Sequence, residues 1–134
     1  MIRTNTGIDT SVLVRLVTGQ PPDLFALCVD RLSALCEADV EILASNQVIG
    51  EAYVTLQRHY GVSKADARAQ LRTTLTSGLV APLSGRVVLD ALAASGGPGL
   101  FDRLIAIDYE RVGMDTLTLD RRMASLHNVR LVAD

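Results

Sequence analysis

Apolar residues recur along this 134-residue chain in two spacings, and the two spacings alternate. Short apolar runs bounded by turn residues favour strands, whereas apolar positions three and four residues apart favour helices. The runs predict strands over residues 6–9, 41–45, 79–83, 115–120 and 129–133. The helical spacing predicts helices over residues 11–18, 22–37, 46–60, 62–77, 85–95, 100–113 and 121–128.

The alternation of strands with helices predicts the fold class. It is typical of an α/β domain with a mainly parallel central sheet and helices on both faces. We therefore expect one domain over residues 1–134, with about five strands in the sheet. Hydrophobic residues make up 49% of the chain but aromatic residues only 4%, so the predicted core is aliphatic. In such sheets the functional crevice lies at the carboxyl ends of the strands.

Charge and composition limit the possible cellular location of the protein and the partners it could bind. The formal net charge is −2, which argues against a broad basic surface for nucleic acid but leaves room for a local phosphate site. No apolar run approaches the ~18–20 residues that span a bilayer, and "MIRTNTGID" lacks a secretion signal pattern. We expect a soluble, cytoplasmic protein. Cys28 and Cys36 would be about 12 Å apart on one helix, so buried, reduced thiols are expected.

Two acidic residues stand where a predicted strand meets a predicted helix. Asp9 occurs in "TGIDTSVL" and Asp120 in "TLTLDRRMA". If the two strands are parallel neighbours, both carboxylates point into the same crevice. Each could instead be a helix N-cap, since Asp is a preferred residue at that position, and the two roles are compatible.

Three further acids have less distinctive settings. Asp102 begins a helix after the "GGPG" turn, where a carboxylate interacts favourably with the helix dipole. Glu51 lies off the apolar face of its helix, so a solvated side chain or a pair with Arg58 is one explanation. Asp108 falls on the same helix face as Leu104, where a buried charge would be costly, and the sequence offers no firm account of it.

Four stretches containing these acids occur in a recognisable order. They are "GIDTSVLVRLVTG", "NQVIGEAYVTLQRHYGVSKADA", "LFDRLIAIDYERVG" and "TLTLDRR", and together they cover essentially the whole chain. In this order and spacing the chain resembles the PIN-domain ribonucleases, most closely their VapC-type toxins. The resemblance implies a PIN-like three-layer α/β/α domain, in keeping with the alternation of strands and helices.

The resemblance also implies a set of site residues. The family's acidic quartet falls on Asp9, Glu51, Asp102 and Asp120, and Thr118 matches the hydroxyl of the family's "T-x-D". Ser11 stands where the family usually has Asn. The four acids would bind Mg²⁺ or Mn²⁺, which are hard ions that prefer oxygen ligands. A bound ion can activate water and stabilise the phosphodiester oxygens during in-line displacement.

The resemblance leads to a function and to alternatives. The first hypothesis is a metal-dependent endoribonuclease that is the toxin of a type II toxin–antitoxin pair, with a cognate antitoxin and a homodimeric state. The second is a PIN-like RNA-processing nuclease without an antitoxin. A third is a catalytically idle binding module, which four mutually repelling acids argue against.

Overall fold

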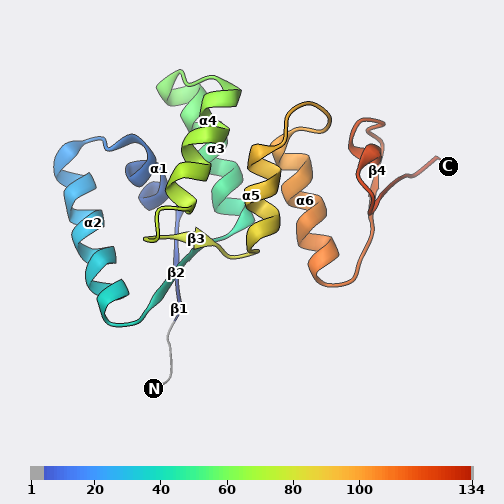
Figure 1. Ribbon diagram of the computed structural model, residues 1–134. Coiled ribbons are helices and arrows are strands. Elements are labelled where there is room, and N and C mark those ends of the chain that lie inside the picture. The colour runs from blue at the N-terminus through green and yellow to red at the C-terminus, as the bar shows by residue number, and fades with distance from the viewer. Residues whose placement is uncertain (1–4, 134) are drawn as a thin grey trace.

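The computed structural model describes residues 5–133, and the elements follow the predicted order (Figure 1). Residues 1–4 and 134 of the predicted domain lie outside the described part. The strands are β1 (Asn5–Ile8), β2 (Glu41–Ala44), β3 (Ala81–Pro82), β4 (Thr116–Thr118) and β5 (Val129–Leu131). The helices are α1 (Thr10–Thr18), α2 (Pro22–Glu37), α3 (Asn46–Tyr60), α4 (Lys64–Leu75), α5 (Arg86–Ala93), α6 (Leu100–Arg111) and the short 3₁₀ helix η1 (Met123–Ser125).

The strands pair in parallel, which confirms the mixed α/β class. β2 lies between β1 and β3, with Ala44 opposite both Ile8 and Pro82. β4 pairs with β5 in a second, two-stranded sheet. The sequence predicted a single central sheet of about five strands. Within residues 5–133 the strands divide instead between these two sheets, so the single sheet is not shown.

An aliphatic core joins the helices to the three-stranded sheet. Its most completely buried large side chains, such as Leu13 of α1, Leu56 of α3 and Leu71 of α4, come from helices predicted by their apolar spacing. Ile42 and Ala44 contribute the inward-facing positions of β2. Burying such side chains stabilises the fold by about 1.5–3 kcal/mol each. The predicted aliphatic core is therefore confirmed.

The segment from Thr116 to Leu131, here called the C-terminal unit, packs apart from this core. Met123 and Val129 form a small apolar cluster with Ala106 of α6. The Asn128 side chain donates a hydrogen bond to the Ala106 carbonyl oxygen at 2.9 Å. Figure 1 shows β4 on the far side of α6 from β1.

Two further features bear on the expectations from sequence. Cys28 and Cys36 are free, as predicted, but each is half-buried instead of fully buried. No single helix within residues 5–133 has the length and apolar character needed to cross a bilayer. The consecutive helices α1 and α2 reach this length and apolar character only when they are taken together, and the chain bends by 111° between them.

Candidate functional site

Asp9 lies at the carboxyl end of β1 and caps α1. Its backbone is extended, and its Oδ1 accepts a hydrogen bond from the Val12 amide at 3.2 Å. The Ser11 hydroxyl donates to the same oxygen at 2.5 Å. Together the Ser11 hydroxyl and the Val12 amide hold the pKa of the Asp9 carboxyl below its ordinary value of 3.8. Asp9 is therefore ionised at neutral pH, and its side chain is exposed to solvent.

Glu51 lies beside the start of α1. The Thr10 hydroxyl donates to Glu51 Oε2 at 2.6 Å, and the Gln47 amide donates to Oε1 at 2.8 Å. These two hydrogen bonds, that of Thr10 first, lower the pKa of Glu51. Of the two explanations from sequence, the structure favours the solvated side chain, because Glu51 is exposed and within residues 5–133 forms no ion pair with Arg58. Thr10, which follows Asp9, thus links the start of α1 to Glu51 of α3.

Asp102 lies in the first turn of α6, which packs directly on α3. The two helices approach closely at Gly50, where an added Cβ would lie 2.4 Å from Cζ of Phe101. Phe101 precedes Asp102, and Gly50 precedes Glu51, so the two helices meet next to both acids. Figure 1 shows the amino end of α6 at the same end of the domain as the carboxyl end of β1.

Asp120 belongs to the C-terminal unit and precedes a turn, because the helix predicted over residues 121–128 is only the 3₁₀ helix Met123–Ser125. Its Oδ1 accepts hydrogen bonds from the Arg122 amide at 2.8 Å and the Met123 amide at 3.3 Å. The Thr118 hydroxyl accepts a hydrogen bond from the Asp120 amide at 3.0 Å, which fixes the turn. Because β4 and β1 belong to different sheets within residues 5–133, strand pairing does not bring Asp120 to the end of β1.

The structure places the predicted site residues in two regions. Asp9 and Glu51 are linked through Thr10, and Asp102 lies on the helix packed beside Glu51, whereas Asp120 and Thr118 stand on another sheet. Within residues 5–133 no three Asp, Glu, His or Cys side chains form a group able to hold a metal ion. The capping interpretation is confirmed for Asp9, whereas Asp120 caps no helix and its Oδ1 instead holds the turn before η1. On each residue a second carboxylate oxygen is left for another role.

Asp108, which the sequence left unexplained, now has a structural role. It is exposed, so no buried charge arises. Its Oδ1 accepts a hydrogen bond from Nδ2 of the buried Asn46 at 2.8 Å, and the same Asn46 nitrogen donates to the Leu104 carbonyl oxygen at 3.1 Å. Asn46 thus fixes the start of α3 against α6, four residues before the contact at Gly50.

We expect Gly50→Ala to destabilise the protein by about 1–3 kcal/mol, because the new methyl group overlaps the Phe101 ring. In an exposed helix the same change would stabilise by about 1 kcal/mol, so the sign is diagnostic. Urea unfolding measures the effect. Gly7→Ala is the control, since its Cβ would meet only the Leu43 carbonyl oxygen at 3.9 Å. A Gly50→Ala protein as stable as the parent would contradict this account of the helix contact.

Sequence reasoning missed three residues that build this region. Thr10 was passed over although it follows Asp9, because its partner Glu51 is 41 residues away. Gly50 carries a signal that could have been used, since an isolated glycine inside a helix usually has a packing reason. Asn46 showed no signal, because a polar residue at a helix start is ordinarily exposed.

Comparison with known proteins adds no identification. No family model, no curated protein and no solved structure matches this chain.

Proposed function

We propose that the protein is a metal-dependent endoribonuclease of the PIN type, acting on RNA phosphodiester bonds. The observation that supports this most is the hydrogen bond from Thr10 to Glu51, which places two ionised acids from distant segments at the carboxyl end of β1. That end of a parallel sheet is where α/β domains place their ligands. Asp102, on the adjoining helix, is the third acid of the proposed site.

The residues present fit Mg²⁺ or Mn²⁺. Both ions prefer hard oxygen ligands, and Mg²⁺ commonly uses one or two carboxylates while it keeps several waters. Asp9 and Glu51 offer carboxylates that hydrogen bonds keep ionised at neutral pH. Each is exposed, so an ion can reach it. The proposed ligands are Asp9, Asp102 and Asp120, with Glu51 as a further ligand or as the group that orients water.

In this proposal each residue around the acids has its own role. A bound divalent ion would supply activation of water and neutralisation of phosphate charge. Ser11 and Val12 hold Asp9 in one orientation, and Thr10 and Gln47 do the same for Glu51. Thr118 shapes the turn that presents Asp120. Such preorganisation lowers the barrier because no reorientation is needed during the reaction.

We further propose that β4 pairs with β1 in the active protein, giving the five-stranded, three-layer PIN-like sheet. Within the described residues β1 pairs only with β2, and β4 only with β5, so each has an open edge. Open strand edges favour pairing with another strand. Leu117 of β4 and Leu119, just after it, are 67% and 85% exposed. Parallel pairing of β4 with β1 would carry Asp120 to the end where Asp9 lies.

The cellular role that we propose is that of a toxin held in check by a cognate antitoxin, with the protein acting as a homodimer. The support is the order of the four motif stretches in the sequence. Apolar surface available for partners runs along α6 and beyond, where Ile105, Tyr109, Val112 and Met114 are 40–69% exposed. Surface of this kind is typical of protein–protein contacts.

Expression of the gene alone in a bacterial host tests the role. We expect growth arrest with new 5′ ends in the RNA, and relief of both when a neighbouring antitoxin gene is supplied. The Asp9→Asn protein, expressed at the same level, should cause neither. Growth arrest by both proteins, without new RNA ends, would contradict a nuclease. Cleavage that no neighbouring gene relieves would favour an RNA-processing nuclease over a toxin.

A further inference from the structure

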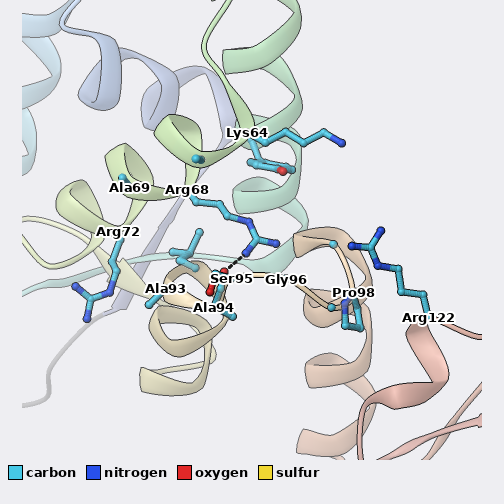
Figure 2. A pocket seen from close by; sticks show the side chains of 15 residues that line it. Lys64, Arg68, Ala69, Arg72, Ala93, Ala94, Ser95, Gly96, Pro98 and Arg122 are labelled. Carbon is cyan, nitrogen blue, oxygen red and sulfur yellow. Dashed lines mark hydrogen bonds between the residues drawn. The ribbon is translucent and has the colours of Figure 1, made fainter.

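A cavity of about 560 Å³ opens between α4 and the loop that joins α5 to α6. Figure 2 shows 15 residues that line it. One wall is α4 from Lys64 to Arg72, and the other is the loop of residues 94–99. Its volume falls in the ordinary range for ligand sites, about 300–1,000 Å³. None of the proposed metal ligands lines it, so it is distinct from the acidic site.

The cavity is strongly basic. Lys64, Arg68 and Arg72 follow one another at intervals of four residues on α4, and Arg122 of the C-terminal unit adds a fourth cation. No acid lines the cavity, and within residues 5–133 none of the four cations forms an ion pair. Figure 2 shows Arg68 reaching to the loop, where its guanidinium donates to the Ala94 carbonyl oxygen, with Lys64 and Arg72 on either side.

The loop on the other wall is built for close approach. Gly96 and Gly97 have φ values of 70° and 67°, a left-handed backbone that favours glycine. Arg103 holds the loop by donating to the carbonyl oxygens of Pro98 and Gly96 at 3.0 and 3.2 Å. Gly99 precedes α6 and has no side chain to cap it, while Asp102 in the first turn already places a carboxylate at the positive end of that helix dipole.

We propose that this cavity binds the sugar–phosphate backbone of single-stranded RNA next to the cleavage site. The inference rests on the proposed function and adds the surface along which the RNA strand would reach the acidic site. Cations one helical turn apart are about 6 Å apart along α4, which suits successive phosphates of an extended strand. Asp102 lies three residues beyond Gly99, so a strand bound here continues over the start of α6 toward the acids.

The site recognises phosphates and not bases. Tyr53 is the one aromatic residue among those that line the cavity, and it is only 8% exposed, so it offers no face for base stacking. Binding should therefore depend little on sequence and strongly on salt, because each neutralised phosphate releases bound counterions. The site needs only α4 and the loop, so it does not depend on where the C-terminal unit lies.

The test is equilibrium binding of a fluorescent single-stranded RNA to the full chain in chelator, where no cleavage interferes. We expect Lys64→Gln/Arg72→Gln to weaken binding about tenfold or more and to lower the salt slope by roughly 0.7 per lost contact. Both side chains are exposed and within residues 5–133 have no partner, so folding should be unaffected. Arg31→Gln/Arg86→Gln removes the same charge elsewhere and should bind as the parent does.

Several outcomes would overturn the proposal. Equal losses in the two double variants would mean that net charge alone matters. Unchanged affinity in Lys64→Gln/Arg72→Gln would exclude the cavity as the RNA site, while metal-dependent cleavage could still support the nuclease. Competition by inorganic phosphate as effective as that by RNA, at equal phosphate concentration, would show a site for free phosphate only. RNA binding that depends on the cavity, without any cleavage in Mn²⁺, would support the proposed binding site but contradict the proposed nuclease activity.

Discussion

Asp9→Asn should abolish RNA cleavage while leaving the fold intact. Asn caps a helix about as well as Asp, so the hydrogen bond to the Val12 amide can persist. The free energy of unfolding without metal should therefore change by less than about 0.5 kcal/mol. Activity should fall by orders of magnitude, because a neutral amide is a far weaker ligand for a hard divalent ion. A cleavage assay in Mn²⁺ and a thermal melt in chelator measure the two effects separately.

Two comparisons make this result decisive. Asp30→Asn, on the exposed side of α2, removes the same charge away from the site and should retain full cleavage. Addition of Mn²⁺ should raise the melting temperature of the parent, since an ion that binds only the folded state stabilises it. Asp9→Asn should lose most of that rise. Retained cleavage with an unchanged response to Mn²⁺ would show that Asp9 is a cap and nothing more.

Leu117→Lys should destabilise the active protein by about 2–4 kcal/mol if β4 pairs with β1. In the proposed three-layer fold, helices would cover the faces of the sheet and with them the Leu117 side chain, and a buried lysine without a partner is costly. With β4 in the separate two-stranded sheet the same side chain is 67% exposed, and the substitution should cost less than about 0.5 kcal/mol. Urea unfolding of the two proteins therefore distinguishes the two arrangements of the strand.

Leu27→Lys is the matched control for this experiment. Leu27 is 63% exposed on α2, far in sequence from β4, and its replacement should be close to neutral. Loss of stability only in Leu117→Lys would support the five-stranded sheet. Equal and small effects in both proteins would contradict it, and would leave Asp120 away from Asp9. Cleavage by Leu117→Lys should fall with its stability, because Asp120 would no longer reach the site.

Local sequence patterns predicted the elements closely, and the reason is physical. The limits of α2 and α3 were predicted to the residue, because Pro22 begins the first and Gly61 ends the second. β3 was predicted five residues long and is two residues long, although Leu83 after it still donates a hydrogen bond to the Ala44 carbonyl oxygen at 2.8 Å. Strand pairing was harder, because the apolar pattern of β4 does not say which neighbour covers it.

In the candidate site, too, local features could be predicted from sequence and long-range contacts could not. The cap formed by Asp9 follows from its residue type and its position before a helix, whereas Asp120 holds a turn where a longer helix was predicted. The environment of Glu51 could not be predicted, since its partner Thr10 is set by how α1 and α3 pack. The basic cavity could not be predicted from sequence, because the net charge of the chain is −2 and the four cations of the cavity come from two distant segments. Long-range contacts, rather than residue types, were the missing information.

The most direct test of the proposed nuclease is the chemistry of the RNA ends that the purified protein produces. With Mn²⁺, water is the attacking group in this account, so one product should end in a linear phosphate and no 2′,3′-cyclic phosphate should form. A strand of 2′-deoxynucleotides at the cut site should not block the chemistry, because the 2′-hydroxyl is not the nucleophile. We expect mass spectrometry to find linear phosphate ends in Mn²⁺ and intact RNA in chelator. Cyclic phosphate ends, or equal cleavage in chelator, would contradict the account.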